Sequence, residues 1–347
     1  MIMINRIYNY YRDIISRGIG GVKNIILLVI YFLSLLLKIF IVSLPLYSCG
    51  GEFETLFDGP SLIYWSEENG SVNRIYSDGT GRKRIISSDH ISLDIAVERS
   101  GRYIFRAVED SSGNYHIRRT GTEGSGNIFV YSPNTDFGPS ALSFDKSGRE
   151  LFWNEYRDVP GLLNNVWKSD SDLILLSELR WASDVVYNHI YSICVDTINR
   201  KIYFSSNSYY DIGTPSGSGN SGSLFMRELD LNTNSNLADL SGSGPGGDSI
   251  PFKGIAVDGR GGYVYYVKHT SGSPAIMRSD LNLANSEEWI AADGFDISKI
   301  ALDLNSRKIY WISASDKRIY RGDMDYPDSG VEVFLNTVGI PTGIALD

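Results

Sequence analysis

Short apolar runs bounded by polar residues recur from about residue 61 to the end of the chain. The most regular of them is a five-residue run that ends on an acid, and it occurs six times: DIAVE (94–98), ALSFD (141–145), SICVD (192–196), GIAVD (254–258), KIALD (299–303) and GIALD (343–347). Apolar runs of this length between turn-forming residues are typical of β-strands. The pattern therefore predicts six copies of one strand.

A second strand follows each acid at a constant distance. Its leading aromatic residues are Tyr64, Phe105, Phe152, Tyr203, Tyr265 and Tyr310. Wherever an acid precedes one of these aromatics, the step between them is seven residues. A third strand places an apolar residue two positions before a base, as in Ile276 and Arg278, and a fourth, less regular strand follows. Four short strands repeated every 41 to 62 residues are typical of the blades of a β-propeller.

The two ends of the repeat predict how the ring closes. The first blade begins at Leu62 without an innermost strand, and the chain finishes on a spare one, GIALD (343–347). The last strand can complete the first blade, which removes the open edges that favour aggregation. The sequence therefore predicts an all-β fold, a six-bladed β-propeller of four-stranded blades over residues 61–347.

The first 48 residues have a different character. Four bases and one acid precede an almost wholly apolar run, residues 25–46, which Lys38 interrupts. A basic flank before a long apolar run indicates an export signal or a membrane anchor, and 22 residues as a helix can span a bilayer. Residues 1–48 are therefore expected to form a hydrophobic helix that is either a signal peptide or an anchor. Both alternatives export the rest of the chain.

The end of this run resembles the lipobox of bacterial lipoproteins. Leu46 lies three residues before Cys49, Ser48 lies directly before it, and two glycines follow. The resemblance implies that Cys49 is lipidated and becomes the mature N-terminus, with residues 49–60 as a short tether. It also implies a protein exported and anchored to the membrane of a bacterial cell envelope or surface. A plain transmembrane anchor remains the alternative.

Composition and charge restrict the partners. The chain has 32 Lys and Arg against 41 Asp and Glu, a net charge of −9, whereas nucleic-acid phosphates require a basic surface. We therefore expect no nucleic-acid partner. The two cysteines, Cys49 and Cys194, cannot form a disulfide framework or a four-cysteine zinc site.

The repeat itself resembles a known family. The segments KIALDLNSRKIYWISASDKRIYRGDMD (299–325) and LIYWSEENGSVNRIYSDGTG (62–81) are similar to the YWTD repeats of the low-density-lipoprotein-receptor class B propellers. The similarity covers about residues 61–347 and implies their six-bladed fold. No copy keeps the final Thr-Asp, and Arg106 stands where an aromatic residue is expected. Receptor function does not follow from the resemblance, because fold and function separate easily.

Two sets of repeated residues have alternative interpretations. The six strand-ending acids could hold a cation in the central channel, but capping of the following turn is the better interpretation, because a residue repeated six times serves the repeat. The leading aromatics could bind sugars if exposed. Their place inside strands favours packing between blades.

The variable connections predict a binding face. In an up-and-down blade, the connections after the second strand and between blades emerge on one face, and here they vary in length while the turn after the first strand does not. The longest insertions lie around blades 3 and 4. The candidate binding residues there are Tyr156, Arg157, Asp158, Tyr209, Tyr210 and Asp211.

Signals of catalysis are few. The four histidines have no metal-ligand spacing, and the chain has no GxSxG elbow, P-loop or CxxC. No catalytic residue, metal or cofactor is predicted. The expected function is that of a membrane-tethered lipoprotein whose propeller binds an unknown protein or glycan without catalysis. The alternatives are a propeller hydrolase, such as a lactonase, or a lyase with its site in the central channel, and a purely structural envelope protein.

Overall fold

A computed structural model describes residues 59–347 of the chain, except for the segments 88–89, 99–101, 134–136, 146–148, 158–164, 173–176, 180–184, 188–189, 207–208, 212–220, 230–237, 244–251, 271–272 and 292–295. Cys49 and the segment predicted to be a signal peptide or anchor lie outside these residues. No helix in the described part of the chain is long and apolar enough to cross a membrane.

The described strands form six four-stranded antiparallel sheets, and each sheet is one blade. From the innermost strand outward, blade 1 contains β26 (Pro341–Leu346), β1 (Leu62–Glu67), β2 (Val72–Tyr76) and β3 (Lys83–Ile86). Blade 2 contains β4 (Ile91–Val97), β5 (Tyr103–Glu109), β6 (Tyr115–Gly121) and β7 (Ile128–Tyr131). Blade 3 contains β8 (Phe137–Asp145), β9 (Glu150–Arg157), β10 (Asn165–Asp170) and β11 (Ser177–Leu179).

The second half repeats the arrangement. Blade 4 contains β13 (Ile190–Asp196), β14 (Lys201–Ser206), β16 (Ser221–Glu228) and β17 (Ala238–Ser243). Blade 5 contains β18 (Phe252–Asp258), β19 (Tyr263–Thr270), β20 (Ser273–Asp280) and β21 (Glu287–Ala291). Blade 6 contains β22 (Ile297–Asp303), β23 (Lys308–Ser313), β24 (Arg318–Asp323) and β25 (Glu332–Asn336), and a short 3-10 helix, Pro327–Ser329, precedes its last strand.

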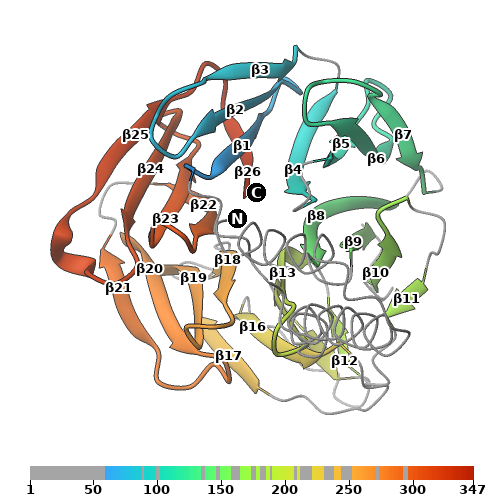
Figure 1. Cartoon of the computed structure of the whole chain (residues 1–347). Helices are drawn as coiled ribbons and strands as arrows, with labels where there is room; N and C mark the ends of the chain where they lie inside the picture. The colour runs from blue at the N-terminus through green and yellow to red at the C-terminus, as the bar shows by residue number, and fades with distance from the viewer. Residues whose placement is uncertain are drawn as a thin grey trace, which may run out of the picture. The chain divides into compact units, whose positions relative to one another are not determined.

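The six blades surround a central axis, with the innermost strands facing it (Figure 1). Each innermost strand contacts the innermost strand of the next blade, and the circle returns from β22 through β26 to β4. The predicted six-bladed β-propeller is therefore confirmed. One further sheet lies outside the blades and consists of β12 (Val185–Tyr187) and β15 (Tyr209–Asp211).

The ring closes through the strand that the sequence analysis identified as spare. β26, the last strand of the chain, pairs antiparallel with β1, with Ile63 opposite Leu346 and Trp65 opposite Ile344. Ile344 and Leu346 are buried in one cluster with Trp65. The chain end therefore supplies the innermost strand of blade 1, as predicted.

A β-bulge recurs in the innermost ladders. The pairing with the second strand shifts register between Ser92 and Asp94 in β4, and at the corresponding place in β8, β13, β18 and β22. A bulge leaves backbone groups without a ladder partner and re-aims the neighbouring side chains. It therefore makes room for polar side chains beside the innermost strands, three to five residues before each strand-ending acid.

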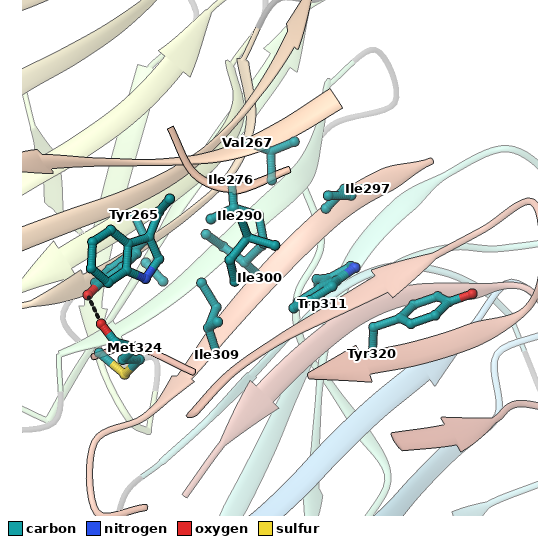
Figure 2. Close-up of a cluster of buried hydrophobic side chains, with 12 residues drawn as sticks. Tyr265, Val267, Ile276, Ile290, Ile297, Ile300, Ile309, Trp311, Tyr320 and Met324 are labelled. Atoms are coloured by element: carbon teal, nitrogen blue, oxygen red, sulfur yellow. Dashed lines mark hydrogen bonds between the residues drawn. The ribbon is translucent and has the colours of Figure 1, made fainter. Parts of the chain in front are cut away.

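Large side chains fill the space between blades. The cluster drawn in Figure 2 joins Tyr265 and Val267 of blade 5 to Ile309 and Trp311 of blade 6, all of them fully buried. All six leading aromatics are likewise fully buried. The predicted role of these aromatics in packing between blades is confirmed.

Candidate binding face and central channel

One face of the ring carries short, uniform turns held by the strand-ending acids. Asp303 accepts hydrogen bonds from the backbone N–H groups of Asn305 and Ser306 at 3.1 Å, and Asp196 accepts two in the same way. Asp258 accepts one from Gly261 at 2.7 Å. Capping of the turn, predicted from the repeat, is confirmed at these three acids.

The same acids also bind the next blade. Arginines four residues after an acid reach back to the acid of the preceding blade: Arg149 to Glu98 at 3.0 Å, Arg200 to Asp145 at 3.1 Å and Arg307 to Asp258 at 2.6 Å. All three arginines have positive φ, between 54° and 55°. The left-handed conformation costs a non-glycine residue about 1 kcal/mol or more, so the guanidinium–carboxylate contact offsets local strain.

Tyrosine hydroxyls make a second connection between blades. The Tyr203 hydroxyl donates to the carbonyl oxygen of Leu281 in blade 5 at 2.8 Å, and the Tyr265 hydroxyl donates to that of Met324 in blade 6 at 3.3 Å, as Figure 2 shows. Burial raises the pKa of Tyr265 to about 12 and also raises the pKa of Tyr203. These phenols stay neutral at physiological pH and act as fixed donors.

The opposite face carries the connections of variable length. After the second strand of a blade they range from residues 271–272 in blade 5 to residues 207–220 in blade 4. The blade 4 connection contains β15, and the connection from blade 3 to blade 4 contains β12. These two segments pair antiparallel, with Val185 opposite Asp211 and Tyr187 opposite Tyr209. Two insertions that are separate in the sequence therefore form one two-stranded ribbon.

The predicted binding residues fall into three groups. Tyr209, Tyr210 and Asp211 form β15 of this ribbon. Tyr156 and Arg157 end β9, opposite Gly138 and Phe137 of β8. Asp158 lies outside the described residues, as does the lipidation candidate Cys49. No strand pairing joins the end of β9 to the ribbon in the described part of the chain, so the binding role of these residues stays a prediction.

A charged pair connects distant blades at the central channel. The Lys299 ammonium in β22 of blade 6 donates to Oδ2 of Asp94 in β4 of blade 2 at 2.8 Å. It also donates to the carbonyl oxygen of Tyr191 in β13 of blade 4 at 3.2 Å. One ammonium group thus joins three innermost strands, of which no two are neighbours in the ring.

Asp94 is the buried centre of this arrangement. Its side chain is 6% exposed and that of Lys299 is 16% exposed. Besides the lysine, Asp94 accepts from the backbone N–H of Ile95 at 2.9 Å and from that of Leu142, in blade 3, at 3.0 Å. A buried carboxylate needs this many donors to offset its loss of hydration.

This ion pair was not predicted from the sequence, although the repeat contained a signal for it. Four residues before the strand-ending acid, the other four blades carry small residues: Ala141, Ser192, Gly254 and Gly343. At the two glycines the reason is close approach, since a Cβ on Gly343 would lie 2.9 Å from the backbone nitrogen of Ile95, and one on Gly254 would lie 2.9 Å from that of Ile300. Asp94 and Lys299 are the two residues that depart from this pattern, and their side chains form an ion pair with each other.

The acid ring does not form a metal site in the described residues. No group of three or more His, Cys, Asp or Glu side chains there is arranged to hold an ion. The carboxylates of Glu98, Asp145 and Asp258 are buried against arginines instead. Arginine occupies the space that a cation would need at these three acids.

Comparison with known proteins identifies the fold but no family. No family model matches the chain, and no curated protein sequence matches it. A chain in the crystal structure of a nidogen/laminin complex superposes with a TM-score of 0.62 at 12% identity, covering 83% of this chain and 98% of that one. The fold is that of a six-bladed β-propeller.

TolB from Acinetobacter baumannii is a second structural neighbour. It superposes with a TM-score of 0.60 at 13% identity, covering 84% of this chain and 67% of that one. At such identities the similarity concerns the fold alone, and function has to be argued from the site.

Proposed function

We propose that this protein is an exported, membrane-tethered lipoprotein whose propeller binds a protein or a glycan through the face that carries the variable connections. The observation that carries the proposal is the pairing of β12 with β15, which unites two insertions of blades 3 and 4 in one ribbon. A rigid scaffold with variable loops on one face is the usual arrangement of binding proteins. The ribbon contains Tyr209 and Tyr210, and tyrosine is a residue type enriched in binding hot spots.

The channel supports the same proposal. Asp94 and Lys299 neutralise each other there, and Asp94 has donors at both carboxylate oxygens. A carboxylate that acts as a general base or nucleophile needs an oxygen that is free to react, whereas both oxygens of Asp94 accept hydrogen bonds. These contacts favour a structural role for Asp94 and Lys299 over a catalytic one.

The nidogen/laminin complex adds a precedent for protein binding. It contains a chain of this fold within a protein–protein complex. We infer by analogy that a protein is the first partner class to test, with a glycan as the second.

The first experiment tests the tether. Intact mass and membrane partitioning are measured for the full chain from its native host, with Cys49→Ala and the control Cys194→Ala. We expect a mature chain that begins at Cys49 with added acyl mass, lost only in Cys49→Ala. A full-length membrane chain that is indifferent to Cys49→Ala would refute lipidation and leave a helix anchor.

The second experiment tests the face. The detergent-solubilised full chain is applied to glycan arrays and to arrayed surface proteins of the host, beside a Tyr209→Ser/Tyr210→Ser variant and an Asn305→Ser variant on the uniform-turn face. Binding that is lost in the first variant and kept in the second supports the proposal. Binding that the ribbon variant leaves unchanged contradicts it, as does an absence of binding in both formats.

A further inference from the structure

A serine, a histidine and an aspartate form a continuous hydrogen-bonded chain on blade 2. Nδ1 of His116, in β6, lies 2.9 Å from Oγ of Ser132, which directly follows β7. Nε2 of the same ring lies 3.1 Å from Oδ2 of Asp110, which directly follows β5. Of the three histidines in the described part of the chain, only His116 contacts both a serine and an acid.

Asp110 is fixed and ionised. Its Oδ1 accepts from the backbone N–H groups of Ser112 at 2.8 Å and Asn114 at 2.9 Å, and the Asn114 side-chain amide donates to both carboxylate oxygens. The backbone hydrogen bond from Asn114, followed by the hydrogen bond from His116, holds the pKa of Asp110 well below its ordinary value. The carboxylate therefore keeps both its charge and its orientation.

The ionised carboxylate determines the state of the imidazole. A carboxylate only accepts hydrogen bonds, so Nε2 of neutral His116 carries the proton and Nδ1 has the free lone pair. That lone pair faces the Ser132 hydroxyl, which must then be the donor. A hydroxyl that donates to a neutral imidazole held by a carboxylate is the arrangement of an activated serine nucleophile, and the two ring nitrogens can exchange roles because they are conjugated.

The serine is accessible while its base is sheltered. Ser132 is exposed, whereas the side chain of His116 is only 14% exposed. The Phe129 ring, 48% exposed, packs on His116 with the ring centroids 4.7 Å apart. The exposed part of Phe129 offers an apolar surface beside the imidazole, suited to the acyl group of a small ester.

We propose that Ser132 is a nucleophile for acyl transfer from small carboxylic esters to water, with His116 as general base and Asp110 as its positioning residue. The Ser132 oxygen forms a bond to the ester carbonyl carbon, and its proton passes to His116 Nδ1. The carbon–alkoxy bond then breaks, and the departing alcohol takes that proton. Water attacks the acyl-serine, its proton passes to His116, and the proton returns to Ser132 as the acid leaves.

This site is separate from the proposed binding ribbon, since Ser132, His116 and Asp110 all belong to blade 2. The spacing of Asp110, His116 and Ser132 matches no local sequence motif, so no nucleophile was predicted from the sequence. The proposal goes beyond the binding function, and either one can fail without the other.

A fluorophosphonate probe tests it directly on the full chain in detergent. We expect the phosphonyl adduct on the Ser132 peptide by mass spectrometry, none at that peptide in Ser132→Ala, and a labelling rate lowered about 100-fold in His116→Gln, the usual contribution of a general base. Asp110→Asn should lower the rate about tenfold. Ser111→Ala, at an exposed serine outside the hydrogen-bonded group, is the matched control and should label like the wild type.

The same variants are assayed for hydrolysis of 4-nitrophenyl butyrate, and tryptophan fluorescence checks that each one is folded. Labelling of Ser132 that depends on His116 establishes the activated nucleophile. A folded wild type that fails to label at Ser132, or a folded His116→Gln that labels at the wild-type rate, would overturn the proposal.

Discussion

The pair of Asp94 and Lys299 provides the sharpest test of the closed ring. Lys299→Ala removes the ammonium and leaves a buried carboxylate with only the N–H groups of Ile95 and Leu142. Removing one partner of a buried ion pair costs about 3–5 kcal/mol, and the two remaining donors place the expected loss near the lower end, at about 3 kcal/mol. Asp94→Ala leaves Lys299 with the Tyr191 carbonyl and partial access to water, so we expect the free energy of unfolding to fall by about 2 kcal/mol.

The double variant should cost less than the sum of the two. It gives blades 2 and 6 the small residue that the other four blades carry at this position, and it leaves no unpaired charge. We expect a loss of about 2 kcal/mol, hence a coupling energy of about 3 kcal/mol between the two side chains.

Equilibrium urea unfolding of the full chain in detergent measures these values. All six tryptophans lie at residue 65 or later, so their fluorescence reports on the propeller. With a slope of about 3 kcal/mol per molar urea for a domain of this size, Lys299→Ala should lower the midpoint by about 1 M. Arg84→Ala, which removes an exposed base from β3, is the control and should change stability by less than about 0.5 kcal/mol. If the losses in the free energy of unfolding of the two single variants add to that of the double variant, with a coupling energy below about 0.5 kcal/mol, the ion pair is refuted.

Three further outcomes are expected in the same assay. Ile344→Ala in the closing strand should lower the free energy of unfolding by about 2–5 kcal/mol, because Ile344 is buried against blade 1. The control Ile198→Ala, at a residue that is 51% exposed, should change it by less than about 0.5 kcal/mol. Equal effects of the two variants would contradict closure by β26. Arg307→Gly should be more stable than Arg307→Ala by about 1 kcal/mol, because φ is 55° there, and the reverse order would refute the left-handed conformation. Burial lowers the pKa of His269, so the unfolded chain takes up a proton at this side chain more readily than the folded one. The free energy of unfolding should therefore be constant above about pH 6.5 and fall as the pH drops below it. His269→Gln should flatten this pH dependence, and an unchanged dependence would refute the assignment to His269.

The candidate site was predictable only in part. The variable connections marked blades 3 and 4 as the candidate binding region, and the structure pairs Tyr209–Asp211 with β12, a partner that no local pattern marks. The hydrogen-bonded group of Asp110, His116 and Ser132 could not be predicted from the sequence for a similar reason. His116 lies in β6, whereas Asp110 and Ser132 directly follow β5 and β7, and sequence spacing does not reveal which side chains share an edge of a sheet.

The sequence by itself determined the blade count, the strand order within a blade and the closure by residues 343–347, because each strand is a local alternation of apolar and polar residues that recurs with fixed spacing. It also determined the buried role of the leading aromatics and the turn-capping acids, which are properties of a single repeat. Only the tertiary structure decided that Arg307 reaches Asp258 of the preceding blade and that Lys299 reaches Asp94, 205 residues away in sequence. Such contacts depend on the curvature of the whole ring, which brings distant innermost strands within reach of one ammonium group once the last strand has closed it.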